Sequence, residues 1–260
     1  MRPQVFLLLL AALLLSPGES LAQGPTLWSL RGDHNTVFLF GSVHLLREGD
    51  FVLDGPLAEA YQSAESLLLE VDSSGLTPAS VESITLQRAV DEQGRIEPWF
   101  EALNVTTATL NRVGFTVDSG VEAQLQRQAQ RDGKRLGGLE TLDAQLAALD
   151  TLGPEVQQDL LAKSREDANR PLHELVQFVE AWKAGDQAYL DQRLKEEFAA
   201  HPEVYRALIV ERNRRWAQHI AELLKETEDF LIVVGALHLV GDDSLQSLLE
   251  ADGHRAERLR

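Results

Sequence analysis

Short apolar runs near both ends of the chain have the pattern of β-strands. Residues 26–31 and 36–42 are two such runs, and the segment GDHN at 32–35 between them is typical of a tight turn, which predicts a β-hairpin. Residues 66–71, SLLLEV, are almost continuously apolar, as expected of a buried strand. Residues 230–235, FLIVVG, are the most strand-like segment. Weaker strand patterns cover residues 135–139 and 255–259.

The middle of the chain has the apolar spacing of helices. Helical patterns cover residues 56–64, 78–92, 98–113, 119–132, 141–226 (with breaks near Gly153, Pro171, Gly185 and Pro202) and 243–252. Strands at both ends and helices between them predict an α/β (α+β) fold. We expect a central mixed sheet built from N- and C-terminal strands, with the helical middle as a cap or lobe. No linker divides residues 23–260, so we expect a single domain.

The first 22 residues have the pattern of a secretory signal peptide. Arg2 precedes an unbroken apolar run from Val5 to Leu15, and small residues lead up to a cleavage position after about Ala22. The run is short for a membrane span of about 20 residues, although an uncleaved anchor is the alternative. We therefore expect a periplasmic or secreted bacterial protein with no stable membrane span after cleavage.

Composition and charge exclude several classes of function. The formal net charge is −17, from 24 Lys and Arg against 41 Asp and Glu, which argues against a nucleic-acid partner. The chain has no cysteine, so disulfides, thiol nucleophiles and iron–sulfur clusters are excluded. Any metal ion would be held by histidines and carboxylates.

An internal repetition is the most informative feature of the sequence. Residues 37–46 read VFLFGSVHLL and residues 231–240 read LIVVGALHLV, so that Gly41 and His44 match Gly235 and His238. In open α/β sheets, ligands bind at the carboxyl ends of strands, and two such strands side by side would bring His44 and His238 together. One such histidine alone could be an ordinary core residue, but two in matching contexts favour a shared site.

Three carboxylates follow predicted strands. Glu70 ends the apolar run at 66–69, where a buried carboxylate needs a partner, and Asp72 would share its face if the strand continued. Glu140 ends the segment LGGLE, just before a predicted helix. It is either a further site carboxylate or a residue whose negative charge interacts favourably with the N-terminal end of the helix dipole.

A basic segment, VERNRRW at 210–216, interrupts the acidic chain. On a helix, Arg212 and Arg215 share a face, and Trp216 lies one turn from Arg212. The segment is either a solvated helix with a Glu211–Arg215 pair, or it directs an arginine at a carboxylate, a phosphate or a developing oxyanion.

These motifs together resemble the TraB/GumN family, which includes Tiki-type membrane proteases and pheromone-shutdown proteins. The resemblance covers about residues 27–259 and points to the GumN-like branch. The family commonly has Thr at the position of Ser42 and often Asp at that of Glu122. The matching stretches are FLFGSVHLL (38–46), SLLLEVD (66–72), the segment 119–149, AWKAGD (181–186), VERNRRWA (210–217) and VVGALHLVGDDSLQSLLEADGH (233–254).

The resemblance implies a fold related to erythromycin esterases and ChaN-like proteins, and, through the Tiki-type members, metal-dependent peptide cleavage. Residue by residue, it implies His44 and His238 as site histidines and Glu70 as their acidic partner. It also implies Arg212 or Arg215 as a buried cation, and it leaves the role of Glu140 open.

The leading hypothesis is a metal-dependent hydrolase that acts on a peptide or a small ester or amide. His44, His238 and Glu70 would hold a divalent ion, Zn²⁺ or Mn²⁺. Glu140 or Asp72 would act as general base, and an arginine of 212–215 would stabilise the oxyanion.

Two alternatives remain open at this point. In a metal-free hydrolase, His44 would be the general base and Glu70 would orient it. In a non-enzymatic protein, the site would bind haem or another ligand, or the protein would assist polysaccharide export.

Overall fold

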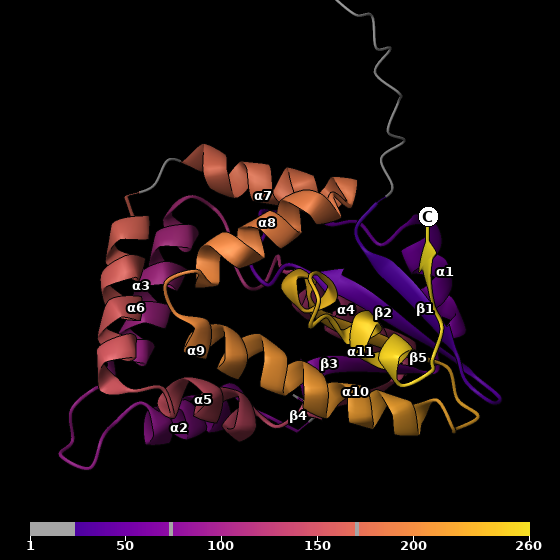
Figure 1. Ribbon diagram of the computed structural model, residues 1–260, viewed down its shortest axis with the longest axis horizontal. Helices are drawn as coiled ribbons and strands as arrows, with labels where there is room; N and C mark the ends of the chain where they lie inside the picture. The colour runs from indigo at the N-terminus through magenta and orange to yellow at the C-terminus, as the bar shows by residue number, and fades with distance from the viewer. Residues whose placement is uncertain (1–23, 73–74, 170–171) are drawn as a thin grey trace, which may run out of the picture.

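The computed structural model describes residues 24–72, 75–169 and 172–260, and the expected signal peptide lies outside them (Figure 1). Six strands form one sheet in the order β4-β3-β5-β2-β1-β6. They are β1 (Leu27–Arg31), β2 (Thr36–Ser42), β3 (Ser66–Val71), β4 (Arg135–Glu140), β5 (Phe230–Gly235) and β6 (Ala256–Leu259). The α/β prediction, with a mixed sheet drawn from both ends of the chain, is confirmed.

Four neighbouring strands run parallel, so their carboxyl ends lie at the same end of the sheet. β2 pairs with β5, β5 with β3 and β3 with β4, all in parallel. β1 pairs antiparallel with β2, as the hairpin pattern predicts, and also with β6. The carboxyl ends of β2, β3, β4 and β5 therefore meet on one side of the molecule.

The helices follow the predicted pattern closely. The bounds are α1 (Gly55–Ser63), α2 (Pro78–Arg88), α3 (Pro98–Arg112), α4 (Val121–Asp132), α5 (Leu142–Asp150), α6 (Pro154–Asp167), α7 (Leu172–Ala184), α8 (Gln187–Phe198), α9 (Pro202–Tyr205), α10 (Glu211–Leu223) and α11 (Leu245–Ala251). The predicted helix 78–92 ends early, at Arg88, because Val90 pairs with Ile96 across a turn in which Gly94 has a φ of +76°. A π-helix, η1 (Arg206–Val210), leads into α10, and a 3-10 helix, η2 (Ala236–Leu239), follows β5.

Alternating residues of the strands feed two hydrophobic cores, one on each face of the sheet. Leu67 and Leu69 of β3 face a core shared with α1, α4, α7 and α8. Leu68 faces the opposite core, which α10 and α11 cover. Because side chains alternate along a strand, Glu70 lies on the same face as Leu68, the face of α10.

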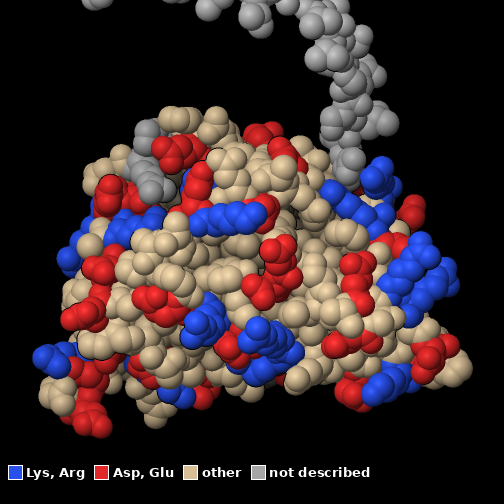
Figure 2. Space-filling view, viewed as in Figure 1, with Lys and Arg blue, Asp and Glu red and all other residues tan. Residues whose placement is uncertain are grey.

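The central helices form a lobe beyond the carboxyl ends of the parallel strands, with α3 beside α6 and with α7 and α8 across the top of the view (Figure 1). A small third core around Ala89, Trp99 and Leu146 joins α2, α3 and α5. Acidic and basic side chains are interspersed over the visible face (Figure 2). Among the described residues, every helix is too short or too polar to span a bilayer.

Candidate functional site

The two matching strands lie side by side, and their histidines approach one carboxylate. Ser42 of β2 is opposite Gly235 of β5. His44 Nε2 lies 3.9 Å from Glu70 Oε1, and His238 Nε2 lies 3.7 Å from the same oxygen. The expectation that the repetition brings both histidines to one place is therefore confirmed.

Glu70 is buried at the centre of the cluster. Its Oε1 accepts a hydrogen bond of 2.7 Å from the backbone N–H of Gly235, and its Oε2 accepts one of 2.6 Å from Arg212 and one of 3.2 Å from Gln145. Burial raises the pKa of this carboxyl, but the charges of His44 and Arg212 and the Gly235 N–H outweigh burial and lower it to about 2. Glu70 is therefore ionised at neutral pH.

Arg212 uses all five of its N–H donors inside the protein. Nε and Nη2 donate to Glu140 Oε1 at 2.9 and 2.7 Å, and Nη2 also donates to Glu70. Nη1 donates to the carbonyl of Leu208 at 3.2 Å and to His238 Nε2 at 3.3 Å. The guanidinium also lies over the ring of Trp216, 4.4 Å from its centroid. Arg212 is thus the buried cation that the resemblance implies, held between two buried carboxylates.

Arg215, one turn further along α10, is placed differently. Its side chain is 54% exposed, and its Nη2 lies 3.8 Å from Glu140 Oε2, beyond hydrogen-bond distance. That oxygen is buried and has no hydrogen-bond partner among the described residues. Glu140 itself belongs to the cluster and does more than end a strand before a helix.

His238 is buried and fixed in one protonation state. The Nδ2 of Asn213 donates to the carbonyls of His238 and Asp243, at 3.2 and 2.8 Å, so its Oδ1 must accept the 2.6 Å hydrogen bond from His238 Nδ1. This assignment leaves a lone pair on His238 Nε2, which accepts from Arg212. Burial lowers the pKa of His238 to about 3, so the ring is neutral at physiological pH.

His44 is half-exposed and has a carboxylate partner. The loop 43–46 is held by backbone hydrogen bonds from Val121 to Val43 and between Leu46 and Thr116, which bring the first turn of α4 beside His44. There Glu122 Oε1 lies 2.8 Å from His44 Nδ1 and also accepts a hydrogen bond from the Ser42 hydroxyl. The Glu122 carboxylate, assisted by Glu70, raises the pKa of His44 above its ordinary value, although Arg212 opposes this shift.

Gly235 leaves the space between these groups open. A Cβ on this residue would lie 3.3 Å from both Glu70 Oε1 and His44 Nε2, and 3.7 Å from His238 Cδ2. Its φ of −52° is one that any residue adopts. A side chain at this position would therefore crowd Glu70 and His44, and glycine avoids that crowding.

The expected metal ligands do not fit a divalent ion as the structure arranges them. A histidine ligand needs a free nitrogen lone pair, but the Nε2 lone pair of His238 accepts from Arg212. The guanidinium also places a positive charge 2.6 Å from Glu70 Oε2. In the part of the chain that the structure describes, no group of three or more His, Asp or Glu side chains is arranged to hold a metal ion.

Three polar residues of the cluster were not singled out as site residues from the sequence: Glu122, Asn213 and Gln145. Glu122 looks like an ordinary acidic residue in the first turn of a helix. Asn213 could have been found, because the buried face of α10 begins with Arg212 and Asn213 and continues with apolar residues. Asp72 is exposed, because β3 ends at Val71.

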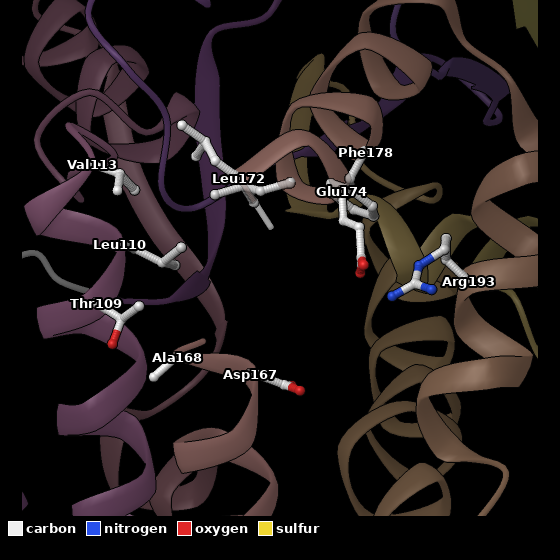
Figure 3. Close-up of a pocket in the computed structure, with 10 residues that line it drawn as sticks. Thr109, Leu110, Val113, Asp167, Ala168, Leu172, Glu174, Phe178 and Arg193 are labelled. Atoms are coloured by element: carbon white, nitrogen blue, oxygen red, sulfur yellow. The ribbon is translucent and has the colours of Figure 1, made fainter. Parts of the chain in front are cut away.

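A cavity of about 270 Å³ lies apart from this cluster in the helical lobe (Figure 3). Leu110 of α3 lines one side, and Phe178 of α7 and Arg193 of α8 line the other. None of its lining residues belongs to the cluster around Glu70.

Comparisons with known proteins agree with the motifs. The model of the TraB/PrgY/gumN family matches residues 26–95 and 79–258. Two curated relatives, each called "Uncharacterized protein YbaP", come from Escherichia coli (strain K12) and Shigella flexneri. Each is 24% identical over 260 residues, covering 86% of this chain and 97% of the relative. No solved structure matches the chain.

Proposed function

The chain belongs to the TraB/PrgY/gumN family. On that premise we propose that it is an exported hydrolase of amide or ester bonds, in which His44 transfers the proton. The observation that carries the proposal is the placement of His44. Its imidazole is 54% exposed, its Nδ1 is held 2.8 Å from a carboxylate, and its Nε2 faces a buried cluster of charges. A carboxylate on one ring nitrogen orients the ring and leaves the other nitrogen for proton transfer.

In this reaction, His44 Nε2 takes a proton from a water molecule as the water oxygen attacks the carbonyl carbon. The same proton then passes from Nε2 to the leaving nitrogen or oxygen as the bond to carbon breaks. Glu122 stabilises the imidazolium that forms between these steps. Because Glu122 raises the pKa of His44, the ring stays protonated to a higher pH than a free imidazole, so the neutral base and the rate should increase toward alkaline pH.

The buried charges have a supporting role in this proposal. Arg212 has no N–H left to donate to an oxyanion, so it acts as a fixed positive charge between Glu70 and Glu140 that helps to keep Glu70 ionised. Glu70 in turn adds a negative charge 3.9 Å from His44 Nε2, which favours the imidazolium.

The test is hydrolysis of a library of peptides, esters and amides by the mature chain. Cleavage by the wild-type chain should fall on the order of 10²-fold in Glu122→Gln, because His44 loses its orienting carboxylate. Glu48→Gln, which changes an exposed carboxylate four residues from His44, is the matched control and should leave the rate unchanged. Absence of cleavage, or equal rates in the two variants, would contradict the proposal.

A second candidate is the metal-dependent hydrolase, in which His44, His238 and Glu70 hold Zn²⁺ or Mn²⁺. Its support is that both imidazole Nε2 atoms lie within 3.9 Å of one carboxylate oxygen. It requires Arg212 to release His238. Activity lost with a chelator and restored by added Zn²⁺ or Mn²⁺ would favour this candidate, whereas activity that is indifferent to chelators favours the first.

Export to the periplasm or cell exterior remains part of the proposal. It is supported by the signal-peptide pattern of residues 1–22. Expression of the full chain with a C-terminal tag should give a mature protein that begins near Gln23 in the periplasm or medium. A full-length protein retained in the cytoplasm would contradict it.

A further inference from the structure

The two arginines of the site differ in how many hydrogen-bond donors they have left. Arg212 is buried, and each of its five N–H groups has an acceptor within the protein. Arg215 is 54% exposed and has one charged partner among the described residues, Glu140 Oε2 at 3.8 Å. Its N–H groups therefore remain available for a molecule that enters the site.

Glu140 attracts Arg215 without taking a hydrogen bond from it. The Oε1 of Glu140 accepts two hydrogen bonds from Arg212, while its Oε2 accepts none among the described residues. The negative charge of Glu140 thus attracts Arg215 toward the cluster but leaves the N–H donors at the edge of its guanidinium free. Such a fork of N–H groups matches the two oxygens of a carboxylate.

We propose that Arg215 binds a carboxylate of the substrate and so selects acyl compounds with a free acid group, such as the carboxyl-terminal part of a peptide. The inference rests on the hydrolase proposed above and names its class of substrate. His44 and Arg215 are the two half-exposed groups that contact the buried carboxylates, His44 beside Glu70 and Arg215 beside Glu140. In the proposed arrangement, a substrate that spans the buried Glu70–Arg212–Glu140 chain would present its reacting bond to His44 and its acid group to Arg215.

The surrounding charges favour a monoanion over a phosphate dianion. Glu140 lies 3.8 Å from Arg215, and Glu70 lies on the other side of Arg212. These carboxylates repel a dianion more strongly than a monoanion, and the fork of Arg215 can donate to both oxygens of a single carboxylate. A carboxylate therefore fits the site better than a phosphate.

The experiment compares pairs of ligands that differ only in this charge. N-acetyl dipeptides with varied side chains are prepared as free acids and as carboxamides, and their dissociation constants for the mature chain are measured by saturation-transfer NMR. For the best-bound pair, the acid should bind about tenfold more tightly than the amide.

Arg215→Gln should remove this preference, and Arg215→Lys should keep part of it, because a point charge remains without the fork. Arg214→Gln is the matched control, since the side chain of Arg214 is 57% exposed and pairs with Glu211, and it should retain the whole preference. Thermal unfolding of each variant checks that the fold is intact.

The proposal is overturned if no acid in the panel binds more tightly than its amide. It is also overturned if the preference survives in Arg215→Gln, or if Arg214→Gln removes it equally. A preference for acids without any cleavage would leave Arg215 as a carboxylate-binding residue and reject the hydrolase. Cleavage that depends on His44 but ignores the acid group would do the reverse.

Discussion

The two Gly-x-x-His motifs have the same sequence pattern and adjacent strands, but their histidines occupy opposite environments. His44 is half-exposed, with the Glu122 carboxylate on Nδ1. His238 is 5% exposed, with the amide oxygen of Asn213 on Nδ1 and the guanidinium of Arg212 on Nε2. An anion beside the first ring favours its cation, and burial with a cation beside the second favours its neutral form.

The difference shows that the repeated motif determines the position of each histidine on its strand. The residues that pack around the imidazole determine its protonation state. The partner of His44 comes from the start of α4 and that of His238 from the start of α10. In the proposed hydrolase, this difference makes His44 the proton-transfer group and His238 a support for the buried charges.

Removing each imidazole should separate the two roles most clearly. His44→Ala should lower kcat/KM by roughly 10²–10⁴-fold and change the free energy of unfolding little, because the ring is half-exposed. His238→Ala should destabilise the fold by about 2–4 kcal/mol, because it leaves a cavity and unpaired groups on Arg212 and Asn213. Turnover and urea unfolding are measured on both variants. A large loss of stability in His44→Ala with a small one in His238→Ala would contradict these roles.

Replacing Arg212 should test how much this cation stabilises the buried carboxylates beside His238. Arg212→Met leaves Glu70 and Glu140 buried without their cation, so the free energy of unfolding should fall by about 3–5 kcal/mol. Adding Glu70→Gln and Glu140→Gln to this variant should restore part of the loss, since the uncompensated charges are then gone. Arg214→Met is the exposed control, and an equal effect at Arg214 would argue against a special role for Arg212.

Filling the space between the histidines should affect catalysis more than folding. In Gly235→Ala, the added Cβ lies 3.3 Å from His44 Nε2, so the imidazole has to move away from its position beside Glu70, and kcat/KM should fall about tenfold. Gly153→Ala is the matched control, because Gly153 has a similar backbone conformation (φ −59°) and open space around it. Equal rates in the two variants would show that the reaction occurs elsewhere.

The two histidines should give the stability opposite dependences on pH. The lowered pKa of His238 contributes stability that is present above its ordinary value of 6.5 and is lost as the pH falls toward about 3. The raised pKa of His44 contributes stability that is present below 6.5 and is lost as the pH rises toward about 10. The first effect should amount to about 2 kcal/mol between pH 6.5 and 5, and the second should be smaller because water screens the exposed ring.

Urea unfolding between pH 5 and 9 measures both slopes. His238→Gln should remove the loss of stability on the acid side, and Glu122→Gln should weaken the loss on the alkaline side. The stability that remains pH-dependent should fall toward alkaline pH in His238→Gln and toward acid pH in Glu122→Gln. The same direction in both variants would contradict the contrast between the histidines.

Much of the sheet and part of the site could be predicted from the sequence, because both depend on local patterns. The apolar runs located the strands, and the repeated motif with Glu70 located the edge of the sheet where the polar cluster lies. The partners of the histidines could not be predicted, because Glu122 and Asn213 reach them through tertiary packing of α4 and α10. The same packing decides which arginine is buried: Arg212 and Arg215 share a face by spacing, but only Arg212 lies between Glu70 and Glu140.

The contrast between the histidines can be tested most directly by imidazole ¹⁵N NMR of the mature chain across pH 5–9. We expect His238 to remain neutral with its proton on Nδ1 at every pH, and added Zn²⁺ to leave its Nε2 signal unchanged. We expect His44 to be protonated at pH 5 and to titrate above 6.5, and Glu122→Gln to lower its pKa. A His238 ring that titrates near 6.5, or that binds the metal through Nε2, would contradict the account.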